Sequence, residues 1–203
     1  MDPRSLYTFV PEAWASVQGT EPVLVHLLEG YVDAGGVSRT LCEQILTHCE
    51  HTPVVDFDAD QLHDYRSRRP TLTFDSDHWA AAAMPSLTLH RVTDAAGRHF
   101  LLLAGQEPDT QWVRAIEAIL EVARGLGVSQ LVSANGIPMG VPHTRPLLIT
   151  THGTKPELIS GNPVFIDRVQ VPGSFGSLLE YKAGERGLAG RGFVVHVPTY
   201  LAQ

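Results

Sequence analysis

Cysteine is scarce in this sequence, and its placement excludes a disulfide-stabilised protein. The 203 residues contain two cysteines, Cys42 and Cys49, on one predicted helix. Their seven-residue spacing places them about 10 Å apart along the helix axis, which is too far for a disulfide bond. We therefore expect both to be buried free thiols in a reducing compartment.

Positive charge is also scarce, with 15 lysines and arginines against 22 acidic residues and a net charge of −7. Binding to nucleic acid depends on clustered basic side chains that neutralise phosphates, so we expect no nucleic-acid partner. The basic run at residues 66–69 is short, and we interpret it as a solvated loop.

Long apolar runs are absent from the sequence, and no stretch reaches the roughly 20 residues that a membrane-spanning helix needs. The first nineteen residues lack the apolar segment of a secretory signal, since they include Asp2, Arg4 and Glu12. We therefore expect a soluble, cytoplasmic protein that does not bind membranes.

A single α/β domain is the architecture that the length and the hydrophobic pattern predict. Residues 1–20, with Pro3 and Pro11 among scattered apolar side chains, are predicted to form an N-terminal arm, and residues 21–203 the domain. The domain opens with an apolar run at residues 23–28, followed by a glycine turn and a helical pattern. This order is the first half of a parallel βαβ unit.

The rest of the chain continues the α/β pattern. Strands are predicted at residues 54–58, 71–74, 86–92, 98–104, 130–134, 147–151 and 192–197, and helices after a cap at Asp109 or Thr110 and at Ser174. The segments 71–74 and 86–92 alternate like half-buried antiparallel strands. Together with 98–104, the second predicts an antiparallel hairpin on a mainly parallel sheet that is flanked by helices on both faces.

The sequence stops directly after its last predicted strand, where α/β proteins place a covering helix. We therefore expect an open sheet edge, a sheet that a partner covers, or a shortened chain, and we predict a homo-oligomer.

Three loops follow predicted parallel strands and are expected to open at one edge of the sheet, where α/β proteins bind ligands. They span residues 30–36, 105–110 and 135–145. The candidate ligand-binding residues that they contribute are Asp33, Gly35, Gly36, Glu107, Asp109, Asn135, His143 and Arg145. The sequence therefore predicts one shared cleft.

The glycine turn of the first loop has two interpretations. The amino end of a helix can hold an anion, but the turn matches neither GxGxxG nor the P-loop pattern, and Asp33 would repel a phosphate. We favour the structural interpretation, in which Gly35 and Gly36 let the chain bend and Asp33 caps the following helix.

Arg145 is the only arginine in the three loops, and its planar guanidinium could bind a carboxylate or phosphate. Alternatively, it pairs with an acid of the other two loops while His143 hydrogen-bonds its own loop. If the loops share a cleft, Arg145 lies within pairing reach of those acids. We then expect Arg145→Ala to destabilise the fold and Arg68→Ala to leave it unchanged.

Motifs for metals and nucleophiles are absent from the sequence. Acids and histidines gather at residues 56–63 and 75–78, but neither group has the spacing of a zinc or calcium site. The sequence has no GxSxG elbow, and we interpret Ser174 as a helix cap. We therefore expect no metal and no cofactor, and the sequence identifies no catalytic residues.

Five further motifs are GYVDAG at 30–35, YRSRRP at 65–70, EPD at 107–109 with Trp112, HTRP at 143–146 and GRGFVVHVP at 190–198. Together they resemble actinobacterial members of the proteasome assembly chaperone 2 family. The resemblance covers the chain from about Val23 to Gln203. It implies an α/β/α fold similar to the nucleoside phosphorylase fold, often self-associated. Eukaryotic and archaeal relatives are non-enzymatic helpers that bind proteasome subunits.

The sequence departs from this family pattern in two respects. Relatives usually continue into a helical carboxyl-terminal region, which this sequence lacks. The proteasome-docking tail of some relatives is also absent, because Tyr200 is fourth from the end. The resemblance implies a chaperone-like binding or assembly protein without catalysis, whose bacterial role it does not specify. The alternative is an enzyme that acts on a nucleoside-like or other small ligand in the three-loop cleft.

Overall fold

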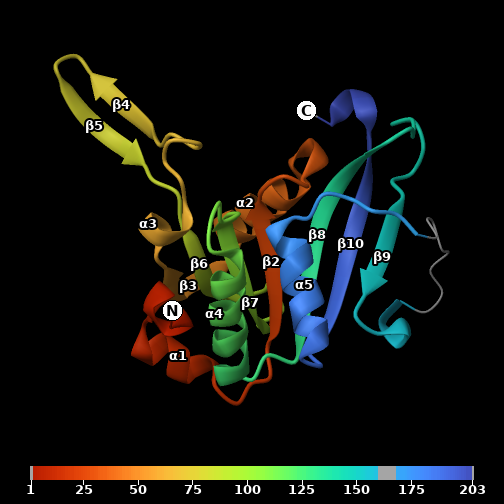
Figure 1. The fold of residues 1–203 in the computed structure, drawn as a ribbon, viewed down its shortest axis with the longest axis horizontal. Coiled ribbons are helices and arrows are strands. Elements are labelled where there is room, and N and C mark those ends of the chain that lie inside the picture. Colours follow the sequence, from red (N-terminus) through yellow and green to blue (C-terminus); the bar gives the residue numbers. More distant parts are fainter. Residues whose placement is uncertain (1, 160–167, 203) are drawn as a thin grey trace.

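The structure is a computed structural model that describes residues 2–159 and 168–202. Its centre is an eight-stranded mixed sheet in the order β1-β3-β6-β7-β2-β8-β10-β9 (Figure 1). The strands of this sheet are β1 Tyr7–Phe9, β2 Val23–Glu29, β3 Glu50–Phe57, β6 Leu87–Thr93, β7 His99–Gln106, β8 Gln130–Met139, β9 Ile149–Gly153 and β10 Ala189–Pro198. Helices on both faces complete the predicted α/β class, which is confirmed.

The four central strands β7, β2, β8 and β10 are parallel to one another. The strands on either side of them, β6 and β9, run antiparallel. The predicted antiparallel hairpin is confirmed as the pair β6–β7. Parallel direction in the centre places the loops after β7, β2 and β8 at one edge of the sheet, as the sequence predicted.

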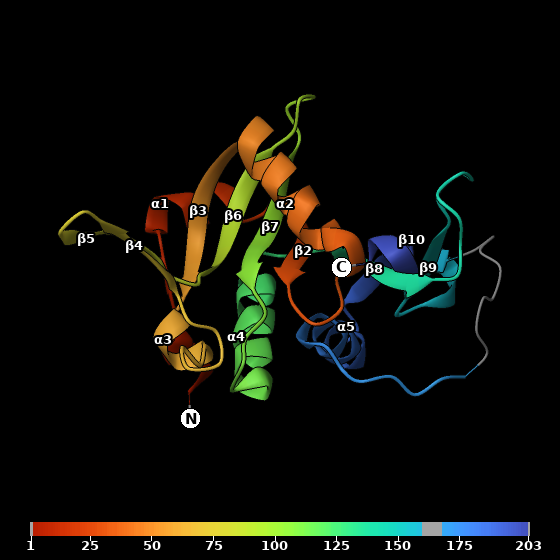
Figure 2. The same cartoon turned by 90° about the horizontal axis from the view of Figure 1, so that it is seen from above.

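Three helices cover the parallel centre (Figure 2). Helices α4 (Trp112–Gly125) and α5 (Phe175–Glu185) pack on one face, and α2 (Val37–His48) packs on the other. The larger core cluster lies beneath α4 and α5 and includes the fully buried Leu103 and Phe175. Burial of one such side chain stabilises the fold by about 1.5–3 kcal/mol. Most of the hydrophobic stabilisation therefore comes from this face.

The smaller cluster beneath α2 includes the two cysteines, which are half-buried free thiols. Burial raises the pKa of Cys42 to about 11, so this thiol is protonated at neutral pH. The helix presents its apolar side to Leu27 and Leu102 of the sheet.

The first twenty residues contribute to the sheet. A 3₁₀ turn at Pro3–Leu6 leads into β1, which pairs antiparallel with β3, and helix α1 follows at Pro11–Val17. Leu6 and Val17 are buried in the larger core cluster. The segment predicted as an N-terminal arm therefore provides one edge strand.

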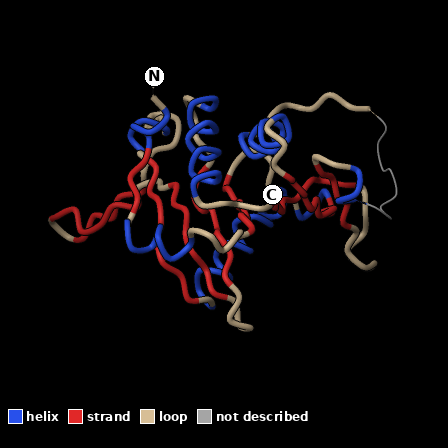
Figure 3. Tube along the Cα trace, turned by 90° about the horizontal axis from the view of Figure 1, so that it is seen from below, coloured by secondary structure: helices blue, strands red, loops and turns tan. Residues whose placement is uncertain are grey.

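A second, two-stranded sheet projects from the domain (Figures 1 and 3). It consists of β4 (Thr71–Asp75) and β5 (His78–Ala83), and every residue in it is exposed. The antiparallel strand predicted at 71–74 is confirmed as β4, but the expectation that it is half-buried is wrong, because no layer of the domain covers the apolar side of this hairpin. We did not predict β5, whose alanine run has weak strand propensity.

The remaining elements are short. They are α3 Ala59–Leu62 and 3₁₀ turns at Ala34–Gly36, Pro156–Ile159 and Thr199–Leu201. Within the described ranges, no helix is long and apolar enough to span a membrane.

The two predicted helix caps differ in outcome. Ser174 caps α5, since its Oγ accepts the N–H of Ser177 at 3.1 Å, and this prediction is confirmed. Helix α4 begins later than predicted, with Gln111 at the cap position. Asp109 and Thr110 do not cap the helix because their side-chain oxygens are engaged elsewhere. The Asp109 carboxylate accepts from Arg68 and from the N–H of Asp64, and the Thr110 hydroxyl donates to the carbonyl of Gln61.

Candidate functional site

The glycine turn after β2 has a local structural role. One carboxylate oxygen of Asp33 accepts the N–H of Ser38 at 2.7 Å, and the other accepts the N–H of Arg39 at 3.2 Å. Gly35 and Gly36 adopt φ angles of 66° and 62°, a left-handed conformation that favours glycine. The interpretation of Asp33 as a cap for the following helix is confirmed, and a ligand-binding role for these three residues stays a prediction.

Glu107, after β7, joins three segments of the chain. Its side chain is buried, with one carboxylate oxygen accepting the N–H of Tyr31 at 2.8 Å and the other the N–H of Phe175 at 2.5 Å. The carboxylate lies so close to Gly30 that a Cβ there would be 1.9 Å from Oε2. Glu107 therefore connects the loop after β2 with the first turn of α5, at the centre of the predicted cleft.

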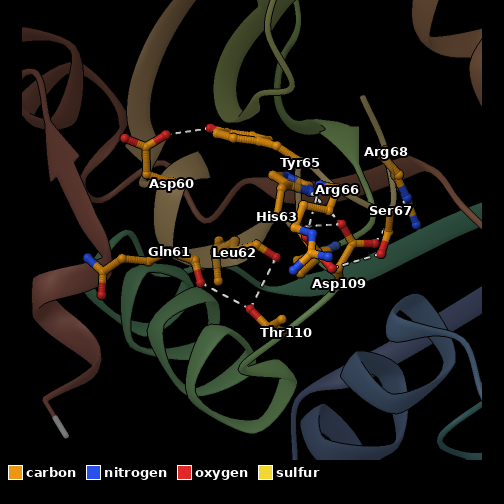
Figure 4. Close-up of polar contacts among 12 residues, drawn as sticks. Asp60, Gln61, Leu62, His63, Tyr65, Arg66, Ser67, Arg68, Asp109 and Thr110 are labelled. Atoms are coloured by element: carbon orange, nitrogen blue, oxygen red, sulfur yellow. Dashed lines mark hydrogen bonds and ion pairs between the residues drawn. The ribbon is translucent and has the colours of Figure 1, made fainter. Parts of the chain in front are cut away.

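Asp109 lies two residues further on, and its side chain lies among residues of the loop after α3 (Figure 4). Its carboxylate pairs with Nε of Arg68 at 3.0 Å and accepts the N–H of Asp64 at 3.0 Å. His63 approaches the same carboxylate at 3.8 Å, and burial lowers the pKa of this histidine. Asp109 therefore fixes the loop between α3 and the projecting hairpin.

The loop after β8 does not close over these acids. Arg145 is exposed and makes no ion pair with Asp33, Glu107 or Asp109, all three of which the structure describes. The predicted pairing of Arg145 is therefore wrong. Its physical reason is that each acid already has closer partners: backbone N–H groups for Asp33 and Glu107, and Arg68 for Asp109.

His143 is bound to the end of the chain instead. Its N–H donates to Oη of Tyr200 at 2.9 Å, and its Nδ1 lies 2.6 Å from the same oxygen. The two rings meet edge to face, with centroids 5.8 Å apart. One of the two alternatives from the sequence has His143 bonding within its own loop, whereas its partner in the structure is the 3₁₀ turn after β10.

A small cavity of about 60 Å³ lies between the central strands and α5. From the predicted set, it is lined by Glu107 and Asn135. Asp33, Asp109, His143 and Arg145 are not among its lining residues, so the predicted cleft is divided into separate environments. The lining residues that sequence reasoning missed are His26, Ser133, His152, Ser177 and Glu180.

Two histidines in this lining have opposite pKa shifts. Burial lowers the pKa of His26 from 6.5 to about 4, so its imidazole is neutral at physiological pH. His152 lies nearer the surface, where a 2.8 Å hydrogen bond between its Nε2 and Oε2 of Glu180 raises the pKa of the imidazole. The cavity therefore combines a neutral imidazole with a histidine–carboxylate pair.

One sequence signal could have identified part of this lining. His26 interrupts a run of apolar residues, and a titratable side chain inside a fully buried strand needs a specific environment. His152 and Glu180 are far apart in the sequence and become neighbours only through the fold. Within the described residues, no group of three or more His, Cys, Asp or Glu side chains is arranged to hold a metal ion.

The fold and this edge define a three-layer α/β domain whose strand ends carry a buried polar cavity and whose surface carries a projecting hairpin. Residues 27–203 match the model of the PAC2 family. The chain belongs to this family, which confirms the resemblance drawn from its motifs. A search of curated proteins finds no match.

Solved structures of similar proteins include ones from actinobacteria and archaea. The Mycobacterium tuberculosis protein Rv2714, of unknown function, is 43% identical with a TM-score of 0.92, over 98% of this chain and 70% of that one. A Corynebacterium glutamicum protein of unknown function is 32% identical with a TM-score of 0.90, over 97% and 74%. The fold is also similar to that of Rv2125, a proteasome-assembly chaperone homologue from M. tuberculosis, at 21% identity and a TM-score of 0.81, over 89% and 77%.

Proposed function

We propose that this chain is a chaperone-like binding and assembly protein without catalytic activity, which acts as a homo-oligomer and binds a protein partner. The observation that carries this proposal is the β4–β5 hairpin, which projects from the domain (Figure 3). Its apolar side chains are exposed. A surface of this kind marks a protein interaction site.

The hairpin has the composition of an interface. Leu72, Phe74 and Trp79 are 50%, 56% and 67% exposed, and the rings of Phe74 and Trp79 meet edge to face with centroids 5.1 Å apart. An isolated two-stranded hairpin is marginally stable in water, so packing against a second chain would stabilise it. Aromatic side chains of this type contribute most to binding at protein interfaces.

Family membership supports the same role. Rv2125 is described as a proteasome-assembly chaperone homologue, and PbaB of Pyrococcus furiosus, with a similar fold, as an archaeal proteasome activator. These descriptions apply to those proteins. For this chain they support a partner that is a protein.

Light scattering on the purified protein tests self-association through the hairpin. We expect the wild type to be oligomeric at micromolar concentration, and Phe74→Asp/Trp79→Asp to be monomeric but still folded. Val113→Asp, at an exposed apolar position on α4, is the matched control and is expected to stay oligomeric. A monomeric wild type would contradict the proposal.

Affinity capture with the wild type and the hairpin variant tests for a partner. We expect one specific protein to be captured by the wild type, in an amount that rises with the concentration of the wild type. We expect the hairpin variant not to capture it. Recovery of the same proteins by both would contradict a hairpin-mediated role.

A second function rests on the polar cavity at the strand ends: an enzyme that acts on a nucleoside-like or other small ligand. A thermal-shift screen with nucleosides, nucleotides and phosphate tests it, since a ligand that binds the folded state raises the melting temperature. A shift of several degrees with one compound would favour this function over assembly.

A further inference from the structure

A row of polar side chains crosses the sheet beneath helix α5. His26 on β2 is paired with Ser133 on β8, Ser133 with Gly192 on β10, and Gly192 with His152 on β9. Residues that are directly paired across neighbouring strands share one face of the sheet. On β7 the row continues as Leu103, which is fully buried. The polar part therefore begins at His26 and extends to the sheet edge.

The glycine in this row allows the two histidines to flank Ser133. A Cβ at Gly192 would lie 2.2 Å from Cε1 of His152, so the imidazole lies over the glycine and leans toward β8. On the other side of Ser133, His26 packs under α5, where a Cβ at Gly176 would lie 3.3 Å from its Cε1. Two glycines thus provide the space in which these side chains converge.

Two members of the row are buried without partners. His26 is 6% exposed and Ser133 is 9% exposed, and both line the cavity of about 60 Å³. Neither side chain makes a hydrogen bond within residues 2–159 and 168–202. Neither residue has a side-chain polar atom fully enclosed by protein, so the side-chain polar atoms of both open on the cavity and are available to a molecule bound there.

The charges in the cavity wall are already matched by protein groups. Glu107 accepts two backbone N–H groups, and Glu180 pairs with His152. An ionic occupant would therefore have no free counter-charge and would lose its hydration. The polar groups that remain are the neutral imidazole of His26, the hydroxyl of Ser133 and the side-chain amide of Asn135, each of which can donate and accept a hydrogen bond. This lining suits an uncharged group with both a donor and an acceptor.

The cavity adjoins a larger groove. His152, Ser177 and Glu180 line both the cavity and a groove of about 470 Å³ beside β9 and α5. One water needs about 10–15 Å³ of such space, so the cavity accommodates about four to six non-hydrogen atoms. The groove also contains the exposed ring of Tyr181, against which an apolar or aromatic group can pack.

We propose that His26 and Ser133 bind the uncharged polar head of a small molecule, of the carboxamide class, whose aromatic remainder lies in the groove beside Tyr181. The amide nitrogen and oxygen supply the donor and the acceptor that these two side chains lack. This site is separate from the hairpin, so a negative result here would not contradict the assembly role, and the reverse also holds.

Benzamide, benzoate and benzamidine test the proposal because they have nearly the same shape and carry no charge, a negative charge and a positive charge. We expect benzamide, titrated to about 20 mM, to shift the NMR resonances of the His26 ring and of the backbone amides around Ser133. Benzoate and benzamidine are expected to bind at least about tenfold more weakly. Equal binding of all three, or no saturable shift with benzamide, would overturn the proposal and leave water as the occupant.

Ser133→Ala is expected to weaken benzamide binding about five- to tenfold, since it removes one hydrogen bond. Ser129→Ala is the matched control, because the Ser129 hydroxyl bonds the carbonyl of Glu21 outside the cavity. An unchanged affinity in folded Ser133→Ala would reject the assignment. If that variant does not fold, the chemical shift of the His26 ring in the wild type is the deciding measurement. A ligand that binds elsewhere would leave this chemical shift unchanged.

Discussion

Two sets of polar residues lie near the same edge of the sheet and differ in their environment. Beneath α5, Glu107 and His26 are buried among strands and helix. On the loop after β8, His143 and Arg145 are exposed, and they contact the chain end or solvent. The sequence draws attention to the second set because it forms a recognisable motif. The comparison teaches that the structural importance of a polar residue at a strand end depends on what covers it.

Glu107→Ala gives the largest expected effect. The substitution leaves the N–H groups of Tyr31 and Phe175 buried without an acceptor, and we expect it to lower the free energy of unfolding by about 3 kcal/mol. Urea denaturation measures the loss. Glu107→Gln keeps the size of the side chain, and we expect its free energy of unfolding to lie between those of the wild type and Glu107→Ala.

Glu43→Ala is the control for Glu107, because this exposed acid lies on the outer side of α2. We expect it to change stability by less than about 0.5 kcal/mol. Equal effects of the two substitutions would contradict the role of Glu107 in joining the strand ends to α5.

His26 makes the buried set sensitive to acid. Its pKa is about 4 in the fold against 6.5 in the unfolded chain, with Glu180 of α5 and His152 of β9 as the charged groups around it. Below pH 6.5 the unfolded chain therefore binds a proton that the folded chain excludes, and stability falls until about pH 4. The expected contribution is about 3 kcal/mol.

Urea denaturation at pH 7 and pH 4.5 measures this effect in the wild type and in His26→Leu. We expect the variant to lose less stability than the wild type between the two pH values. His48→Leu, at an exposed position on α2, is expected to retain the wild-type dependence. The same pH dependence in all three proteins would show that other groups cause the loss.

Sequence reasoning predicted the parts of the fold that local patterns determine. The β2 strand, its glycine turn and α2 follow from an apolar run, two glycines and helical spacing, and the β6–β7 hairpin follows from alternation around a turn. The projecting hairpin was missed because alternation in 71–74 indicates a strand but not which layer, if any, lies under it.

The site was harder to predict because its partners come from distant segments. Asp33 was correctly interpreted as a cap, since the helix that it caps begins four residues later. The pairing of Asp109 with Arg68 depends on how the loop after α3 folds back, which spacing does not reveal. The row from His26 to His152 depends on strand order and register across four strands.

Arg68→Ala has a smaller expected effect than the buried substitutions. The sequence predicted no change in stability for this variant, whereas the structure predicts a loss. Arg68 is 37% exposed and pairs with Asp109, which is 16% exposed. Partly exposed ion pairs contribute little, so we expect a loss of about 0.5–1 kcal/mol that decreases with added salt. Thermal unfolding in low and high salt measures both features. A loss that salt does not change would indicate packing rather than charge.

Arg145→Ala has the smallest expected effect, and it tests the comparison at its exposed end. The guanidinium is solvated and makes no ion pair with the three acids, so we expect a change within about 0.5 kcal/mol. Double-mutant cycles give the sharper measurement, because they isolate the coupling between two side chains. We expect Arg68 and Asp109 to be coupled by about 0.5–1 kcal/mol, and Arg145 and Asp109 by nothing measurable. A measurable coupling energy between Arg145 and any of the three acids would support the shared cleft after all. Solvated side chains on separate loops are not coupled unless they come into contact.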